Sequence, residues 1–279
     1  MRLKFFRGFL FVFGIILCLP IIAVVLGSLK SGGELSDALA PIIGTAEGSV
    51  QWTLLPFYPT GMHFVKLLFY TLEFFTVFWN SIKLVGCILL GQMLVAIPAA
   101  FGFSRFSFRG KHALFLSYVI LMLMPFSVLM LPSYLMLNGM HLMNTHWAII
   151  LPAVFSTFPV FIMYRGFAAI PKEMYEAAKI DGAGDWQTFV KIGLPLGTPG
   201  ILSALVLGFL EYWNMVEQPL AFLEDLSLWP LSLYLPEINL QRAGMALAAS
   251  VITLIPAVFV FFMGQDYLES GITASGMKE

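Results

Sequence analysis

The sequence predicts an all-α membrane protein with six transmembrane helices. Hydrophobic residues make up 59% of the 279 residues and charged residues only 11%, against about 25% charged residues in ordinary soluble domains. Six long runs, uncharged except for Lys83 in the second, are apolar on every side, so they do not show the alternation that strands of a membrane barrel require. Because lipid offers no partner to backbone amides, each run is expected to be a helix of about 20 residues. The runs cover residues 9–29, 75–103, 113–137, 147–164, 192–210 and 244–264.

The first run follows Arg2, Lys4 and Arg7, so it has the basic start of a cleaved signal peptide. Its apolar stretch is longer than a typical signal core, and five further runs follow it. We therefore expect a retained first helix.

The second run is preceded by a long segment, residues 30–74, which is rich in Gly, Pro and Ser at first and then amphipathic. A short interfacial helix leading into the second span is expected near its end. This gives three regions: 1–73 with the first helix and an external segment, 74–266 with five spans and cytoplasmic helices at about 171–193, and 267–279 as a cytoplasmic C-terminal tail.

Positive charges set the expected orientation, because Lys and Arg accumulate in short cytoplasmic loops. With the N-terminus inside, eleven of the fifteen Lys and Arg residues fall on the cytoplasmic side. Both termini are then cytoplasmic, and the protein crosses the membrane several times. The eleven are Arg2, Lys4, Arg7, Arg105, Arg109, Lys111, Arg165, Lys172, Lys179, Lys191 and Lys278.

Several functions are disfavoured by composition. The net charge of −1 gives no basic face for nucleic acid. Cys18 and Cys87 lie in apolar runs and are expected to be small buried residues rather than a disulfide, and the four histidines lack metal-ligand spacing, so no metal site is predicted. No Gly-Lys-Ser/Thr phosphate loop occurs, so the chain is not expected to hold ATP or any other cofactor itself.

The segment between the fourth and fifth runs, residues 165–191, is the charged exception in an apolar protein, and its sequence predicts two short helices. Pro171 suits a helix start and Glu173 the positive end of a helix dipole. Gly182 can adopt the left-handed conformation that ends a helix. Asp185 is expected to cap the next helix.

The first of these helices has the features of a docking surface. Ala177 and Ala178 would let another protein approach the backbone closely, and Met174 and Ile180 would provide apolar anchors. From the pattern alone, an amphipathic loop lying on lipid headgroups is equally compatible.

The same segment resembles the EAA signature of permease subunits of binding-protein-dependent ABC importers, which reads E-A-A, three residues, G, nine residues, I-x-L-P. The likeness extends over nearly the whole chain and is greatest to the second permease subunit of maltose-type, carbohydrate-uptake transporters. Further similarity lies in Asn80-Ser81, Trp213-Asn214, Trp229-Pro230-Leu231 and the tail residues Gln265 and Tyr267. The matching signature residues are Glu176, Ala177, Ala178, Asp181, Gly182, Ala183, Phe189, Ile192, Leu194 and Pro195.

The resemblance implies the transmembrane domain of a type I ABC importer in a bacterial inner membrane, with the EAA helix docked on a dimer of cytoplasmic ATPases that hold ATP and Mg. It also implies a second homologous permease subunit, expected to form a heterodimer, and an extracytoplasmic solute-binding protein. Gly271, Ile272 and Lys278 resemble the family tail that reaches toward the ATPases, although the family usually ends in Lys-Gly and this chain in Lys278-Glu279.

A polar path through the spans is expected because prolines break helices in lipid only where neighbours or a cavity satisfy the freed backbone. Aromatic faces and amide or carboxylate groups suit a sugar, and interhelical hydrogen bonds are the alternative role for such residues. Glu217 and Gln218 are polar where the family is more apolar, so we expect them to bear on substrate choice. The path candidates are Asn80, Gln92, Ser127, Glu211, Trp213 and Asn214.

We therefore predict the permease subunit of a sugar importer, not an enzyme. A permease of the same kind for a polyol, glycerol phosphate or peptide is the main alternative. A secondary transporter or channel predicts internal repeats or an intramembrane charge relay, and a membrane enzyme predicts a constellation of catalytic groups within the spans. The spans contain almost no charge, and no such catalytic constellation is found in them.

Overall fold

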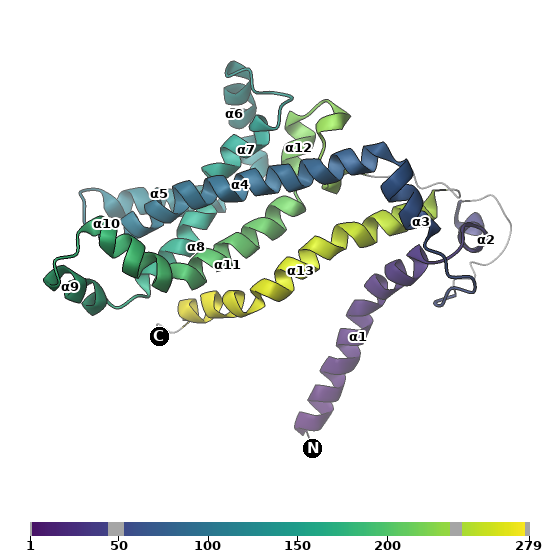
Figure 1. Cartoon of the computed structure of the whole chain (residues 1–279), viewed down its shortest axis with the longest axis horizontal. Helices are drawn as coiled ribbons and strands as arrows, with labels where there is room; N and C mark the ends of the chain where they lie inside the picture. The colour runs from purple at the N-terminus through teal and green to yellow at the C-terminus, as the bar shows by residue number, and fades with distance from the viewer. Residues whose placement is uncertain (1, 44–52, 235–241, 277–279) are drawn as a thin grey trace. The chain divides into compact units, whose positions relative to one another are not determined.

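The computed structural model describes residues 2–43, 53–234 and 242–276, and these residues form helices and turns without any strand (Figure 1). The chain divides into two compact units, one made of residues 1–76 and 234–256, the other of 77–233 and 257–279. Two long helices, α4 (Leu72–Arg105) and α13 (Ala243–Gly276), contribute to both units. The all-α class predicted from the sequence is confirmed.

The first unit begins with α1 (Arg2–Ser28) and α2 (Gly32–Ile43), and the expected short helix before the second span is present as α3 (Met62–Val65), continued by a π turn (Lys66–Tyr70). The His63 ring lies 3.0 Å from the Lys30 carbonyl oxygen. A Cβ at Gly244 would come within 2.3 Å of that ring, so only glycine lets α13 approach it. Phe74 and Tyr234 pack edge to face at 5.5 Å.

The second unit holds most of the remaining helices. They are α5 (Lys111–Leu123), α6 (Phe126–Gly139), α7 (Trp147–Val154), α8 (Thr157–Ala168), α9 (Lys172–Ile180), α10 (Asp185–Thr188), a π turn (Phe189–Gly193), α11 (Leu194–Trp213), α12 (Glu217–Phe222) and the 3-10 turns Leu226–Leu228 and Leu231–Leu233.

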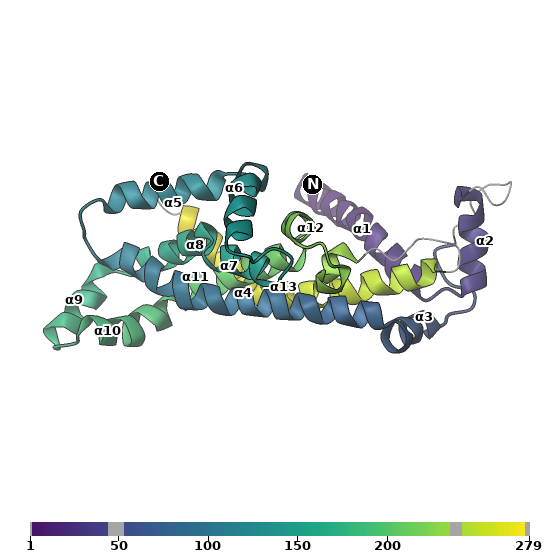
Figure 2. The same cartoon turned by 90° about the horizontal axis from the view of Figure 1, so that it is seen from above.

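Five helical segments among the described residues are long and apolar enough to cross a membrane, and the bent pair α5 and α6 makes six if it counts as one span. The third predicted run is therefore not one straight helix: its halves meet at 104° (Figure 2). The break falls at Pro125, which has no N–H to donate, and at Met124, whose ψ of 126° is the extended conformation favoured before proline.

The helices α8 and α11 approach each other closely, backbone to backbone, within the second unit. A Cβ on Gly166 would lie 2.9 Å from the Cα of Gly200, and one on Gly200 would lie 2.8 Å from the Cα of Gly166. Small residues allow such close approach, which gives the van der Waals contact that holds helices together in lipid.

The two cysteines differ from the sequence prediction. Both are free, as expected, but Cys18 and Cys87 are exposed on their helices rather than buried. In a membrane helix an apolar residue can face lipid at no cost, so hydrophobicity does not imply burial inside the protein.

Candidate functional site

The helix α9 is bounded by residues whose backbone conformations start and stop a helix. Pro171 precedes it with φ −55° and ψ 139°, and Glu173 lies in its first turn. At the other end Gly182 has φ +80°. The amide of Gly182 donates to the Lys179 carbonyl and the amide of Ala183 to the Ala178 carbonyl, at 3.1 and 2.9 Å.

These two bonds form a Schellman motif, in which glycine is favoured because its position is left-handed. Gly182, the glycine of the EAA signature, thus provides the left-handed backbone conformation that ends α9. A Cβ there would meet nothing within 4 Å, so the requirement for glycine comes from φ and not from space.

The cap of the next helix differs from the prediction. Gly184 occupies the N-cap position of α10 and no side chain caps it, whereas Asp185 is the first helical residue. Its carboxylate still lies in the first turn, where the helix dipole favours negative charge. The helix continues through the π turn into α11.

The inner face of α9 packs on the aromatic end of α4. Tyr175 is buried, and its ring lies 6.2 Å from that of Phe101. Phe101 also contacts the rings of Phe167 and Phe189, at 5.5 and 4.8 Å. These four residues belong to one buried cluster joining α4, α8, α9 and the π turn, so α9 packs directly against two membrane spans.

Arg105 fixes the same junction by polar contacts. Its guanidinium lies 3.2 Å from the centroid of the Tyr175 ring and donates to the carbonyls of Phe167 and Ile170. A cation over an aromatic face is attracted by the ring quadrupole. The end of α4, the end of α8 and the start of α9 are therefore joined at one side chain.

The outer face of α9 is open. Glu176 and Ala177 are exposed, whereas Ala178, which we expected on the docking face beside Ala177, is only 7% exposed. Residues three apart share a helix face, so burial of Tyr175 also turns Ala178 inward. Ile180 is 86% exposed.

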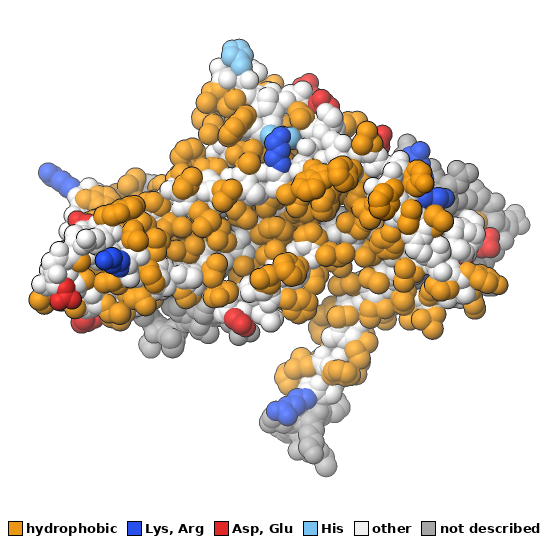
Figure 3. Space-filling model, viewed as in Figure 1, with side chains coloured by type: hydrophobic (Ala, Val, Ile, Leu, Met, Phe, Trp, Pro, Cys, Tyr) orange, Lys and Arg blue, Asp and Glu red, His pale blue; other side chains and the backbone are white. Residues whose placement is uncertain are grey.

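Next to this helix, Trp186 is 73% exposed and lies 5.5 Å from Phe189. Large apolar side chains exposed together beside charged ones are typical of a protein interaction site. Figure 3 shows the charged side chains of α9 beside the largely hydrophobic surface of the spans.

The later residues of the signature lie at the entrance to α11. Ile192 and Leu194 are partly buried against the aromatic cluster, and Pro195 is exposed. A Cβ on Gly193 would lie 2.7 Å from the Phe101 ring. Asp181 is exposed and Ala183 half-buried at the end of α9. The signature therefore shapes both the exposed helix and its attachment to the spans.

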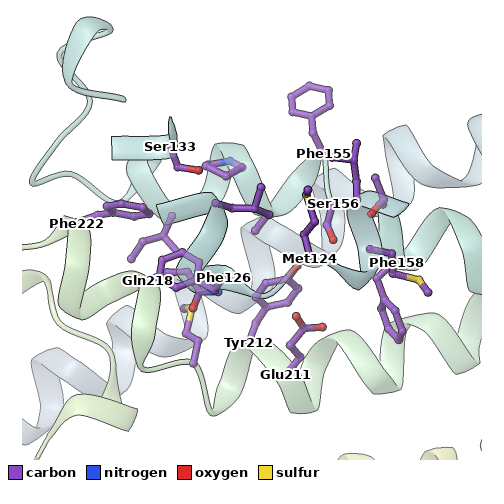
Figure 4. Close-up of a pocket in the computed structure, with 18 of the residues that line it drawn as sticks. Met124, Phe126, Ser133, Phe155, Ser156, Phe158, Glu211, Tyr212, Gln218 and Phe222 are labelled. Atoms are coloured by element: carbon purple, nitrogen blue, oxygen red, sulfur yellow. The ribbon is translucent and has the colours of Figure 1, made fainter. Parts of the chain in front are cut away.

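A second candidate site is a cavity of about 580 Å³ lined by α5, α6, α7, α8, α11 and α12 (Figure 4). Residues at two breaks in membrane helices line it, namely Met124 at one break and Phe155 with Ser156 at the other. Irregular backbone at membrane depth occurs only where protein or a water-filled cavity satisfies it. The cavity volume lies within the range of about 300 to 1,000 Å³ of small-molecule sites.

The cavity combines aromatic faces with a few polar groups. Figure 4 shows Glu211 and Tyr212 next to each other on α11, with Phe126 and Gln218 to one side and Phe158 to the other. The Tyr212 hydroxyl is held by the side chains of Ser156 and Gln92.

The six residues that the sequence suggested for the substrate path lie in different surroundings in the structure. Glu211 alone of the six lines the cavity. Gln92 lies behind it, 1% exposed, and donates to the Ala153 carbonyl at 2.8 Å and to the Tyr212 hydroxyl at 3.1 Å. Ser127 is exposed on α6 and does not line the cavity.

The other three make structural contacts. Asn80 donates to the carbonyls of Ser227 and Trp229, and Asn214 to the carbonyl of Leu210 at the end of α11. Trp213 is buried and stacks on Phe209 at 5.4 Å. Hydrogen bonds within the protein therefore account for Asn80 and Asn214, and packing against a neighbouring ring accounts for Trp213.

Sequence reasoning did not select Tyr212, Ser156 or Ser133, which line the cavity. Serine and tyrosine are common in membrane helices, so no local signal marked them. The tail residues Gly271 and Ile272 continue α13, and Lys278 lies outside the described residues. No group of three or more His, Cys, Asp or Glu side chains that could hold a metal occurs in the described parts of the chain.

Comparison with known proteins gives consistent matches. Residues 92–274 match the family described as binding-protein-dependent transport system inner membrane component. The arabinooligosaccharides transport system permease protein AraQ of Halalkalibacterium halodurans is 31% identical over 74% of this chain and 75% of its own length. The lactose transport system permease protein LacG of Rhizobium radiobacter is 31% identical, covering 71% and 74%.

Two solved structures share the fold. A crystal structure of a bacterial ABC transporter involved in the import of the acidic polysaccharide alginate matches with a TM-score of 0.78 and 21% identity, over 94% of each chain. A structure of a bacterial alginate ABC transporter in complex with alginate pentasaccharide-bound periplasmic protein matches with a TM-score of 0.62 and 17% identity, over 96% of each chain. The fold is that of a type I importer permease.

Proposed function

The chain belongs to the family of binding-protein-dependent transport system inner membrane components, and from this premise we propose that it forms half of the translocation pathway of an ATP-driven sugar or oligosaccharide importer. It is a multi-pass membrane transport subunit and not an enzyme, since its relatives are permease subunits and ATP hydrolysis belongs to a separate protein. The names of the relatives, which include arabinooligosaccharide and lactose permeases, support the sugar.

The observation that carries the proposal is the geometry of α9. The helix ends in a Schellman motif at Gly182, exposes Glu176 and Ile180, and is joined to two spans through Tyr175. We propose that the ATPase dimer binds this outer face, and that closure of the ATPases on ATP and Mg moves the attached spans as a rigid body between inward-open and outward-open states.

The proposal includes the partners named by the resemblance. A second homologous permease would complete the pathway, and a binding protein would deliver the solute, by analogy with the alginate transporter that is complexed with a pentasaccharide-bound periplasmic protein. The docking residues would be Glu176, Ala177, Asp181, Gly182 and Ala183 outside, with Ala178, Ile192, Leu194 and Pro195 shaping the attachment. The tail around Gly271, Ile272 and Lys278 would reach toward the ATPases.

The sugar assignment is tested by uptake. Cells that carry the complete importer, with and without this chain, are supplied with labelled arabinotriose, lactose, maltotriose, a polyol, glycerol phosphate and a peptide. Uptake of one or more of the sugars that depends on the chain is expected. Uptake of only the polyol, the glycerol phosphate or the peptide would contradict the sugar assignment while leaving the permease role intact.

The docking role is tested by a matched pair of substitutions, Gly182→Asp and Gly184→Asp. Both add one carboxylate to the same loop and meet no atom within 4 Å, but only Gly182 has a positive φ, and Asp is a favoured N-cap residue at position 184. We expect Gly182→Asp to insert normally yet to uncouple ATP hydrolysis from uptake, with Gly184→Asp close to wild type. Full uptake by Gly182→Asp would count against docking at α9.

A further inference from the structure

Glu211 provides the only carboxyl group among the side chains that line the cavity in the second unit. The other residues that line the cavity are apolar or carry uncharged hydroxyl and amide groups, and none of them is Lys, Arg or His.

The position of Glu211 argues for a water-filled path. It lies near the end of a membrane-spanning segment that reaches Trp213, yet its side chain is exposed and directed at the cavity. A carboxylate facing lipid is costly, so intramembrane acids face a bundle interior or a water-filled cavity and mark substrate pathways. Glu211 therefore presents its carboxyl group to whatever enters the cavity.

The surrounding groups fit the uncharged parts of a sugar. The Tyr212 hydroxyl is fixed by Gln92 and Ser156, so its ring has a defined orientation. Phe126 and Phe158 add aromatic faces, and the Gln218 amide can donate and accept hydrogen bonds. A hydroxyl of a sugar could donate to Glu211, whereas a uronate carboxylate could not, because both groups only accept.

We propose that Glu211 determines charge specificity, so that the pathway accepts uncharged oligosaccharides and rejects uronates. This rests on the proposed sugar-import function and concerns the same cavity. Two carboxylates held in a partly desolvated cavity repel each other, and this lining offers no cation to compensate. We expect discrimination of at least about tenfold, since like charges repel far more strongly there than in bulk water.

The test measures weak binding directly and leaves out the binding protein, which would otherwise select the sugar first. The assembled importer, with its partner permease and ATPases in nanodiscs, is titrated by saturation-transfer NMR. The probes are arabinotriose, lactose and maltotriose, each paired with the same sugar oxidised to a carboxylate at one primary hydroxyl.

For wild type, the Kd of the oxidised sugar should exceed that of its neutral partner by about tenfold or more. Glu211→Gln should bring the ratio close to one. Glu224→Gln is the matched control, because it removes an exposed carboxylate that does not line the cavity, and it should leave the ratio unchanged.

Two further measurements keep the outcome decisive if Glu211→Gln folds poorly. Glu211→Asp keeps the charge and should keep the discrimination, and the wild-type ratio should shrink as salt screens the repulsion. This inference alone would be overturned if wild type bound the oxidised and the neutral sugar with equal Kd. It would also be overturned if the ratio of the two Kd values changed neither with salt nor in Glu211→Gln. Absence of binding by every sugar, together with no chain-dependent sugar uptake, would overturn the proposed function itself.

Discussion

Single residues at the edges of the spans hold the second unit together through backbone carbonyls. Arg105 bonds to two carbonyls at the end of α8, and Asn80 bonds to two carbonyls of the loop at 227–229. Where water is scarce, unsatisfied carbonyls are expensive. A long donor side chain that reaches a helix end or a loop thus fixes local geometry in a way that an apolar residue cannot.

His146 provides a prediction at this scale. It lies at the N-cap of α7, just before a span, and its ring contacts the Leu228 carbonyl at 3.2 Å. Burial, and then the positive charge of Lys83, lower the pKa of His146 below its usual 6.5. The unfolded chain therefore binds the proton more readily than the folded one.

Stability from this group is complete above the ordinary pKa of His146, 6.5, and falls as the pH drops below that value toward the lowered pKa. Between about pH 7.5 and about pH 5.5, the Tm of the purified protein should fall more in wild type than in His146→Gln, which keeps a donor for Leu228. The same pH dependence in both proteins would show that His146 does not contribute.

The contact of α8 with α11 gives a prediction at the scale of the helix. In Gly200→Ala the new methyl would lie 2.8 Å from a backbone atom of Gly166, so the helices must separate. Overpacking of this kind costs about 1 to 3 kcal/mol, and thermal unfolding in detergent should show a lower Tm.

Gly86→Ala is the control, because a Cβ at Gly86 in α4 meets nothing within 4 Å and alanine favours a helix by about 0.5–1 kcal/mol over glycine. Its Tm should be equal to or above that of wild type. A Gly200→Ala protein as stable as Gly86→Ala would mean that the two helices are not tightly packed.

The distribution of Lys and Arg predicts how the whole molecule is oriented in the membrane. Single cysteines are placed at Asp37 in α2 or Lys179 in α9, both exposed, after Cys18 and Cys87 are replaced. An impermeant maleimide should label Asp37→Cys in intact spheroplasts, and Lys179→Cys only after permeabilisation. The reverse pattern would place both termini outside.

The exposed surface of α9 could be predicted only in part. The spacing of Pro171 and Gly182 marked where the helix begins and ends, because these residues act through their own backbone conformations. The rotation of the helix depends on Tyr175 entering the cluster around Phe101, which is a contact between residues distant in sequence. This is why Ala178 was assigned to the outer face and lies inside.

The cavity was harder to predict than the helix. Polar residues within the spans were visible in the sequence, but Asn80 finds its acceptors 147 and 149 residues away, and only the folded chain shows that it is engaged there. Glu211 was identified because a carboxylate at the end of an apolar run suits the hydroxyls of a sugar. Ser156 and Ser133 line the same space without any such mark.

The sequence by itself determined that this is a helical membrane protein with an EAA helix between its fourth and fifth apolar runs, because lipid forces backbone bonds to be local and because caps act within a few residues. The tertiary structure decided the break at Pro125, the face that α9 exposes and the side chains that share the cavity. Those features follow from packing between distant segments, and packing among uniformly apolar helices leaves no periodic pattern in the sequence.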